Sequence, residues 1–272
     1  MSGYIKRKII HSVSGSREDT YDNVTVEEPL EIRIYYENNT YNVSVIMRTP
    51  VDDFALAAGF LFTEGIIKPE NIIDIKYSED AYVSERDNIV IVSVNSFNKQ
   101  LLGNRNFYVN YSCGVCGKTN INDIFLKAGH LIGHANKINY NQLLRLPDIM
   151  TNKQEIFKNT GGVHAAAILD YSGNILSMGE DVGRHNAVDK AIGKMILNGI
   201  FRSPEAVLQV SGRAGFEIVQ KAAMYGIPIV SSVSAPSSLA VELADEFNMT
   251  LVSFVRGKSF NVYTHPERIG LK

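Results

Sequence analysis

The stretch EAVLQVSGRAGFEIVQKAAMYGIPIVSS (205–232) determines the expected fold of the second half of this chain. A short apolar run leads through a Gly-rich turn into an amphipathic segment, and a second apolar run follows. Apolar runs that alternate with segments of helical periodicity are typical of β-α-β units. The stretch therefore predicts a largely parallel sheet that is covered by helices on both faces.

The segments on either side continue this alternation. Downstream, PSSLAVELADEF (236–247) predicts a helix and MTLVSFV (249–255) predicts a strand. Upstream, HAAAILD (164–170) and NILSMG (174–179) predict a hairpin around Tyr-Ser-Gly, and HNAVDKAIGKMIL (185–197) predicts a helix. We therefore expect a three-layer α/β domain in this half.

The first third of the sequence is β-rich. LEIRIYY (30–36) and YNVSVIMRT (41–49) alternate apolar and polar residues around Glu-Asn-Asn-Thr, which predicts a hairpin. DFALAAGFLFTEG (53–65) predicts a helix that ends at its last glycine, and shorter strands are expected near 72–77 and 88–94.

These patterns divide the chain into three parts. We expect a β-rich α+β subdomain at 1–110, a loop that forms a junction at 111–120, and an α/β domain at 121–272. Within the first part, Asp52 and Asp53 are interpreted as helix caps. Thr63 and Glu64 are interpreted as residues at a helix end.

Composition and charge limit the class of protein. The 272 residues are 45% hydrophobic and 21% charged, with a formal net charge of -2 and a pI of about 6.3. This balance argues against binding nucleic acid or a membrane surface through bulk charge. The N-terminus lacks a signal-peptide pattern, and the apolar run 54–62 is about half the length of a membrane span. We therefore expect a cytoplasmic protein.

The segment YSCGVCGKTN (111–120) contains Cys113 and Cys116, the only cysteines of the chain. A glycine after each cysteine leaves the backbone free to turn and the sulfur atoms accessible. Lys118 and the start of a helix predicted at 121–130 would both favour thiolate over thiol. Such a cysteine can attack a persulfide and take its terminal sulfur, and its neighbour can resolve the adduct.

Two other interpretations of the cysteine pair remain open from the residues alone. Cys113, Cys116, His130 and His134 follow the spacing Cys-x2-Cys-x13-His-x3-His, which fits a zinc-stabilised binding module. A chain of this size does not need a metal to fold, however. A thioredoxin-like reductase would need the pair inside a β-α-β unit, and here the pair precedes that region.

Three loops combine glycine with basic residues, and each lies next to a predicted strand or helix. They contribute Ser211, Gly212 and Arg213; Arg184 and His185; and Arg256, Gly257 and Lys258. A Gly-rich turn at the start of a helix presents unpaired N–H groups to an anion, and arginine adds a bidentate contact. Together, the three loops predict a site for an extended polyanionic ligand.

Several motifs resemble the formate dehydrogenase accessory sulfurtransferase (FdhD) family. The resemblance spans about 48–268 and rests on SCGVCGK, TGGVHAAA, EDVGRHNAVDKAIG, SGRAGFEIVQKAA, SAPSSLAVELA and FNVYTHPER. It implies that the C-terminal part is similar in fold to cytidine deaminases. A zinc deaminase needs His-x-Glu and Pro-Cys-x-x-Cys. This chain has His164-Ala165-Ala166 and Pro236-Ser237-Ser238-Leu239 instead, which excludes deamination.

The resemblance also implies the function. Members of the family accept sulfur from a cysteine desulfurase and pass it to Mo-bis(molybdopterin guanine dinucleotide), a bound substrate on which formate dehydrogenase activity depends. The resemblance does not distinguish molybdenum from tungsten, and it implies no permanently bound metal. Its expected partners are the desulfurase and the formate dehydrogenase catalytic subunit, and it is compatible with a homodimer.

By the same resemblance, Cys113 corresponds to the cysteine that carries the persulfide, and Cys116 corresponds to its helper. The family's segment that contacts the cofactor corresponds to Phe254, Val255, Arg256, Gly257, Lys258 and Ser259.

Overall fold

The computed structural model describes residues 3–79, 86–102, 133 and 136–271. The cysteine loop, the helix predicted at 121–130, and His130 and His134 lie outside the described residues, and so does the junction expected at 111–120. The structure therefore leaves these predictions as they stand.

The N-terminal part of the body is a four-stranded sheet with the order β4-β3-β6-β5. Its strands are β3 (Glu28–Tyr36), β4 (Asn39–Arg48), β5 (Ile72–Tyr77) and β6 (Ile89–Val94), with 3-10 turns η1 (Pro69–Asn71), η2 (Arg86–Asn88) and η3 (Lys99–Leu101). The predicted β3–β4 hairpin is confirmed: Glu37 and Asn38 both have positive φ, as its tight turn requires. Helix α1 (Asp53–Thr63) packs its apolar side chains on this sheet.

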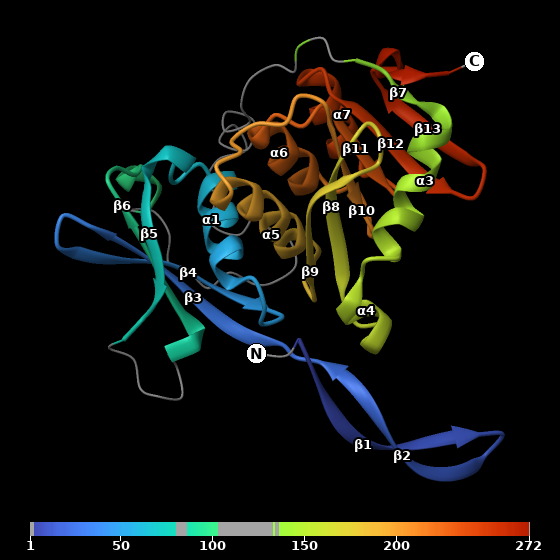
Figure 1. Ribbon diagram of the computed structural model, residues 1–272, viewed down its shortest axis with the longest axis horizontal. Coiled ribbons are helices and arrows are strands. Elements are labelled where there is room, and N and C mark those ends of the chain that lie inside the picture. Colours follow the sequence, from blue (N-terminus) through green and yellow to red (C-terminus); the bar gives the residue numbers. More distant parts are fainter. Residues whose placement is uncertain (1–2, 80–85, 103–132, 134–135, 272) are drawn as a thin grey trace.

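A two-stranded ribbon precedes this sheet and was not predicted. Strands β1 (Tyr4–Val13) and β2 (Ser16–Thr25) pair along their whole length, and Figure 1 shows the ribbon extending away from the body. Its base is held where the Thr25 hydroxyl donates to Thr160 Oγ1 at 2.9 Å. Most of its side chains are exposed, so it has little of the apolar alternation by which strands are recognised.

The second half contains a six-stranded sheet with the order β13-β12-β11-β10-β8-β9. Its strands are β8 (His164–Asp170), β9 (Ile175–Asp181), β10 (Ala206–Val210), β11 (Ile229–Ser232), β12 (Thr250–Arg256) and β13 (Ser259–Thr264). Only the β10–β11 and β11–β12 pairs are parallel, so the prediction of a largely parallel sheet is wrong. The pairs β8–β9 and β12–β13 are joined by short turns, which allow only antiparallel pairing.

Helices cover both faces of this sheet, which confirms the three-layer α/β arrangement. Helices α5 (Arg184–Leu197), α6 (Phe216–Tyr225) and α7 (Ser238–Glu246) form one core with the sheet. Helix α3 (Tyr140–Thr151) covers the other face, beside the small pair β7 (Ile138–Asn139) and β14 (Ile269–Gly270). Helix α4 (Glu155–Thr160) follows α3, and η4 (Pro266–Arg268) precedes β14. Among the described helices, none is long and apolar enough to cross a membrane.

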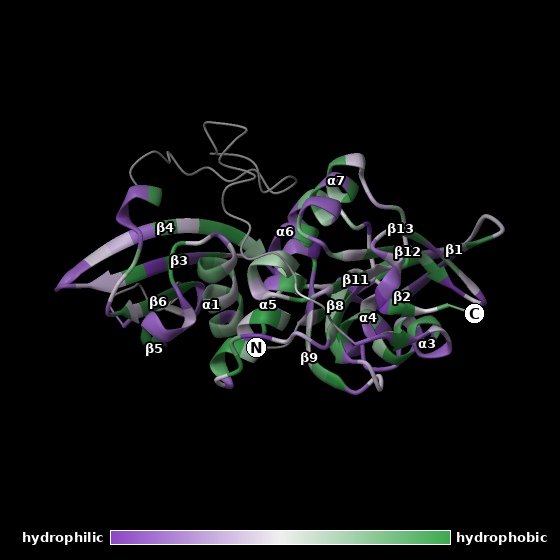
Figure 2. Cartoon of the chain, turned by 90° about the horizontal axis from the view of Figure 1, so that it is seen from above, coloured by the Kyte–Doolittle hydropathy of each residue, from purple (hydrophilic) through white to green (hydrophobic). Residues whose placement is uncertain are grey.

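The two sheets are joined through a crossing of α1 and α5, which lie side by side between them in both views (Figures 1 and 2). The helices approach so closely that only glycine fits at the crossing. A Cβ added at Gly59 would overlap the carbonyl group of Asp189, and one added at Gly193 would overlap the carbonyl group of Ala55. The backbones of the two helices are therefore in direct contact.

A buried arginine anchors the start of α1. Arg48 is fully buried, and its Nε and Nη2 donate to the two carboxylate oxygens of Asp53 at 2.9 and 2.8 Å. Nη2 also donates to Asn88 Oδ1 at 3.0 Å. The interpretation of Asp53 as a helix cap is therefore wrong. Asp52 occupies the cap position, but its side chain makes no capping bond and instead forms an ion pair with Lys194 at 2.6 Å.

The helix crossing generates a stability prediction. Gly193→Ala should lower the free energy of unfolding by about 1–3 kcal/mol, because the added methyl group forces α1 and α5 apart. Alanine has the higher helix propensity, so a net loss isolates the contact. Urea denaturation measures the change, and Gly133→Ala is the control because no atom of the described residues lies within 4 Å of its Cβ position. Unchanged or increased stability of Gly193→Ala would contradict this packing.

Candidate functional site

The first predicted loop follows β10 at the edge where the parallel strands end. The Ser211 amide donates to the Ala165 carbonyl at 3.0 Å, and Ser211 Oγ accepts from the Ala165 amide at 2.9 Å. Gly212 lies against the imidazole of His164, since a Cβ there would be 3.3 Å from Nδ1. Arg213 is exposed to solvent. The loop is thus tied to the first residues of β8 while its arginine remains accessible.

The antiparallel strands β8 and β9 bring the second predicted loop to the same edge. His164 at the start of β8 pairs with Asp181 at the end of β9. The chain then turns through Gly183, the N-cap of α5, into Arg184 and His185. Burial lowers the pKa of His164, and the nearby charges of Arg184 and His185 lower it further. The structure therefore brings these two loops together around His164, which is half-buried.

His185 links α5 to α6. Its Nε2 lies 3.1 Å from Oε2 of Glu217, which sits in the first turn of α6. Burial alone would raise the pKa of Glu217, but the contact with His185 and the charge of Arg184 hold that pKa below its ordinary value. The Glu217 carboxylate is therefore kept in its charged form.

The third predicted loop lies on the same edge, two strands from β10. Phe254 has a positive φ, and its amide donates to the Ser234 carbonyl at 3.3 Å. Val255 is fully buried in the core beneath α3, so only its backbone can meet a ligand. From Arg256 through Ser259 the hairpin turn is exposed, and Tyr140 at the start of α3 donates to the Lys258 carbonyl at 2.9 Å.

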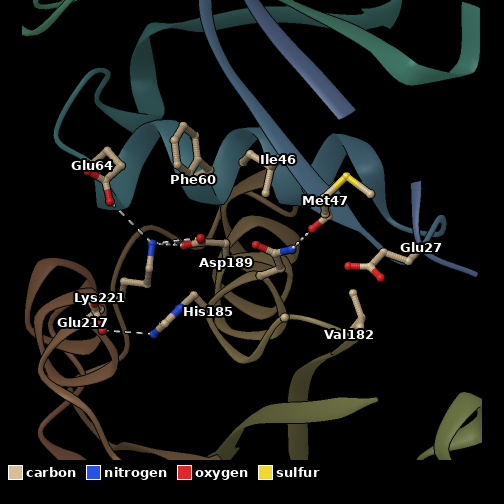
Figure 3. Close-up of a pocket in the computed structure, with 12 residues that line it drawn as sticks. Glu27, Ile46, Met47, Phe60, Glu64, Val182, His185, Asp189, Glu217 and Lys221 are labelled. Carbon is tan, nitrogen blue, oxygen red and sulfur yellow. Dashed lines mark hydrogen bonds and ion pairs between the residues drawn. The ribbon is translucent and has the colours of Figure 1, made fainter. Parts of the chain in front are cut away.

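A cavity of about 150 Å³ lies beside the second of these loops, between α1, β4, α5 and α6. Figure 3 shows residues that line it, which come from both halves of the chain. The lining residues are Glu27, Ile46, Met47, Phe60, Glu64, Val182, Gly183, His185, Asn186, Asp189, Glu217 and Lys221. Of these, sequence reasoning selected only His185 as a site residue.

A buried ion pair stands at the wall of this cavity. Lys221 Nζ lies 2.9 and 2.8 Å from the two carboxylate oxygens of Asp189 and 2.9 Å from Thr63 Oγ1. Thr63 Oγ1 in turn donates to Asp189 at 2.8 Å, and Glu64 lies 3.8 Å from Lys221. The charges of Asp189 and Glu64 hold the pKa of Lys221 above its ordinary value, although burial alone would lower it.

Thr63 and Glu64 end α1, which confirms their interpretation from sequence. They also contact the Lys221–Asp189 pair, which the sequence did not indicate. Lys221 could have provided a signal, because a lysine within the apolar helix FEIVQKAAMY requires a buried partner. The partner, Asp189, lies 32 positions away in the sequence, and no local pattern links the two residues.

A second buried pair fixes the chain just before α1. Lys190 is fully buried, pairs with Asp181 at 2.7 Å and donates to the Thr49 carbonyl at 2.8 Å. Asp181 accepts from the Thr49 amide at 3.1 Å, and Asn186 donates to the Met47 carbonyl at 2.8 Å. The end of β4 is thus bonded directly to β9 and α5.

The part of the chain that the structure describes has no group of three or more His, Cys, Asp or Glu side chains placed to hold a metal ion. The cysteines and histidines of the zinc interpretation lie outside that part. The described residues of the predicted site are backbone turns and basic side chains at the sheet edge, with an acid-lined cavity beside His185.

The fold defines a three-layer α/β protein whose predicted loops lie at the strand ends of its main sheet, which is the edge where open α/β sheets usually bind their ligands. Comparison with known proteins identifies the family. The sequence profile of the FdhD/NarQ family matches residues 25–270, and the chain belongs to this family.

Two named relatives match nearly the whole chain. A protein of Picrophilus torridus named sulfur carrier protein FdhD is 56% identical over 99% of this chain and 100% of its own length. One of the same name from Sulfolobus acidocaldarius is 44% identical, with 98% of both chains covered. A crystal structure of a protein provisionally assigned as a formate dehydrogenase accessory protein, from Desulfotalea psychrophila, matches with a TM-score of 0.78 at 26% identity. It covers 98% of this chain and 100% of that one.

The buried pair predicts a strong and pH-dependent effect. Lys221→Met should cost about 3–5 kcal/mol of stability, because it leaves the Asp189 carboxylate buried without its cation. Burial raises the pKa of Asp189, so the folded variant should keep a proton on Asp189 at a pH where the unfolded chain has lost it. The variant should therefore lose stability as pH rises, and be less destabilised near about pH 5 than at about pH 8.

Denaturant titrations of wild type and variant at both pH values measure this effect. Lys194→Met is the matched control, because its partner Asp52 is partly exposed and such pairs contribute about 0–1 kcal/mol. The role of Lys221 as the cation of a buried pair would be contradicted if both variants lost the same free energy of unfolding. It would also be contradicted if the loss for Lys221→Met became smaller as pH rises.

Proposed function

We propose that this protein is a sulfur carrier that accepts persulfide sulfur from a cysteine desulfurase and transfers it to Mo-bis(molybdopterin guanine dinucleotide), or its tungsten counterpart. Membership of the FdhD/NarQ family over residues 25–270 is the observation that carries the proposal. The names of relatives that match the chain over nearly its full length support it. The Cys-Gly-Val-Cys sequence at 113–116 supplies the chemistry.

Sulfur transfer requires the two cysteines and a thiol reductant. The Cys113 thiolate attacks the outer sulfur of the donor persulfide, the donor S–S bond breaks, and the donor leaves as a thiolate. The Cys116 thiolate then attacks the inner sulfur of the Cys113 persulfide. The terminal sulfur leaves as sulfide for the metal of the substrate, and a Cys113–Cys116 disulfide remains. A thiol reductant supplies the two electrons that restore both thiols.

The clustered loops support the cofactor half of the proposal. The charges of Arg184 and His185 act on His164, Gly212 lies against its ring, and Arg256 lies on the same sheet edge. The starts of α5 and α6 add helix-end amides, which favour phosphate oxygens. A ligand with two guanine nucleotide arms is long enough to engage loops on separate strands.

The remaining parts of the proposal follow from family membership. The client would be a formate dehydrogenase catalytic subunit, the reaction would occur in the cytoplasm, and the carrier would act as a homodimer. The segments 1–110, 111–120 and 121–272 would be a β-rich subdomain, the reactive loop and a deaminase-like domain. The zinc-module alternative is not favoured, since the relatives are named as sulfur carriers.

Cys113→Ala tests the sulfur half. After incubation with a cysteine desulfurase and cysteine, non-reducing mass spectrometry should find the mass of one added sulfur atom on wild type and none on the variant. Client maturation should be abolished, while thermal unfolding should be unchanged. Cys116→Ala is the matched control, which should still load sulfur but fail to release it. Full client activity with Cys113→Ala would contradict the assignment of Cys113 as the persulfide carrier. If the purified protein carries zinc, and His130→Ala abolishes client maturation as fully as Cys113→Ala does, the zinc module would be favoured.

Arg213→Ala and Arg256→Ala test the cofactor half with GDP as a fragment of the cofactor. Each lost charge-assisted contact should cost about 1.5–3 kcal/mol, or about ten- to a hundredfold in affinity, by calorimetry. Persulfide loading of Cys113 should survive both substitutions. Arg17→Ala is the control, because that side chain is 70% exposed on the β1–β2 ribbon. If wild type does not bind GDP, or if Arg213→Ala and Arg256→Ala bind it with the affinity of wild type, the proposed cofactor site is contradicted.

A further inference from the structure

The β1–β2 ribbon stands apart from the cores of the molecule. Figure 1 shows it extending from the body, to which it is held at its base by the contact of Thr25 with Thr160 in α4. Its strands, of ten residues each, nevertheless pair in unbroken register, from Tyr4 with Thr25 to Val13 with Ser16. A two-stranded ribbon alone is only marginally stable in water. The ribbon therefore needs a surface that covers it.

The ribbon has an inner face and an outer face. Residues that are paired across an antiparallel ribbon share a face, and successive pairs alternate between the two faces. Thr25 contacts α4 and pairs with Tyr4, so the face that begins with this pair is turned toward the body and is the inner face. The outer face begins with the next pair. It consists of Ile5, Arg7, Ile9, His11 and Val13 from β1 and Ser16, Glu18, Thr20, Asp22 and Val24 from β2.

Apolar side chains recur along the outer face. Ile5 and Val24 are paired with each other and are 39% and 43% exposed, and Val13 near the tip of the ribbon is 59% exposed. Ile9 lies between them on β1 and is partly exposed. Every second pair of this face therefore contains an aliphatic residue. A partner with the same spacing can remove this apolar area from water.

Pairs of ionisable residues alternate with the apolar pairs. Arg7 pairs with Asp22, and His11 pairs with Glu18. In both pairs the basic residue belongs to β1 and the acidic residue belongs to β2. The outer face is therefore divided along its length into a basic edge and an acidic edge. Such a face is complementary in charge to a second copy of itself.

A twofold axis that runs along the ribbon matches two such faces. It stacks β1 of one copy on β2 of the other, so each residue meets the second copy of its own cross-strand partner. Arg7 then meets Asp22 of the second copy, and Ile5 meets Val24 of the second copy. An axis across the ribbon would instead stack β1 on β1 and bring basic residues together, which is repulsive. Because the inner face is turned toward the body, the two bodies lie on opposite sides of the stacked ribbons.

We propose that the outer face of the β1–β2 ribbon is an interface between two copies of this chain, whose ribbons stack face to face into a four-stranded, two-layer structure. The proposal rests on the homodimer of the proposed function and names the surface that forms it, independently of the sulfur chemistry. Five residues from each strand contribute, which is about half of the roughly 20–30 residues on each side of a standard interface. We therefore expect a reversible dimer with a dissociation constant on the order of micromolar.

Sedimentation equilibrium on the full-length protein, from about 1 to about 100 μM, tests this interface. Wild type should pass from monomer to dimer within this range. Arg7→Asp should raise the dissociation constant at least about hundredfold, because the twofold axis makes it replace two attractive contacts by two repulsive ones. Asp22→Arg should have the same effect for the same reason.

A mixture of the two variants in equal amounts separates a contact between ribbons from any other contact. Arg7→Asp leaves only acidic side chains at positions 7 and 22, and Asp22→Arg leaves only basic ones. Both contacts between unlike copies are then attractive. Sedimentation should show a dimer of at least wild-type affinity, and native mass spectrometry should identify it as one copy of each variant.

Lys6→Asp is the matched control. It makes the same change of charge one position away, but on the inner face, where Lys6 pairs with Asn23. It should therefore dimerise as wild type does. Ile5→Lys and Ile10→Lys form a second matched pair, because Ile10 is the more exposed of the two, at 57%, but belongs to the inner face. Only Ile5→Lys should weaken the dimer, and thermal unfolding shows that each variant is folded.

The stacked interface is contradicted if wild type is still monomeric at about 100 μM, or if Arg7→Asp and Lys6→Asp have the same dissociation constant. A mixture of Arg7→Asp and Asp22→Arg that stays monomeric would also contradict it, because the outer face would then bind a different surface of the chain. If Arg7→Asp stops client maturation while the dimer persists, the outer face binds another protein and the interface is likewise contradicted.

Persulfide loading of Cys113 distinguishes failure of this interface from failure of the proposed function. Loading should occur in Arg7→Asp as it does in wild type, because the substitution leaves both cysteines in place. If wild type loads sulfur but does not dimerise, the interface is wrong and the sulfur half of the proposed function stands. If wild type dimerises through the ribbon but does not load sulfur, the interface stands and the sulfur half is wrong.

Discussion

The direct backbone contact of α1 with α5 is the constraint on which the arrangement of this molecule depends. Gly59 and Gly193 remove the side chains that would otherwise separate the helices, and the carbonyl groups of Asp189 and Ala55 occupy the space. Helices normally pack with their axes about 8–10 Å apart, and small residues at the crossing permit the closest approach. Because α1 belongs to the core of the four-stranded sheet and α5 to that of the six-stranded sheet, this crossing places the two halves relative to each other.

The crossing also determines where charge can be buried. With α1 held against α5, Thr63 reaches Asp189, and α6 brings Lys221 to the same point. A buried ion pair is costly to desolvate, so its benefit depends on geometry that satisfies every polar atom. Such a network contributes less to net stability than to selecting one arrangement of α1, α5 and α6, and it leaves the wall of the adjoining cavity charged.

The antiparallel half of the main sheet is what assembles the site. In a parallel sheet, the start of β8 and the end of β9 would lie at opposite edges of the sheet. Because β8 runs against β10, His164 stands beside Gly212. Because β9 runs against β8, the chain leaves Asp181 at the same edge and enters α5 at Arg184. The first two basic loops therefore converge through hairpin geometry, and Val182, Gly183 and His185, on either side of Arg184, line the acid-lined cavity.

The sequence by itself determined the local elements and the family. The β3–β4 hairpin, α1, the β8–β9 hairpin and the helices α5 to α7 follow from periodicity, glycines and turn residues, all of which act over a few neighbouring positions. The motifs likewise identified the FdhD/NarQ family.

Only the tertiary structure decided the sheet order, the partners of Asp53, Lys190 and Lys221, and the cavity around Phe60 and Glu64. Each of these depends on residues far apart in the chain that meet only after the cores have packed. The residues around Glu64 at the end of α1 do not indicate its contact with Lys221, which lies 157 positions away in the sequence. Local propensity specifies each segment, but long-range burial and charge pairing specify which segments meet.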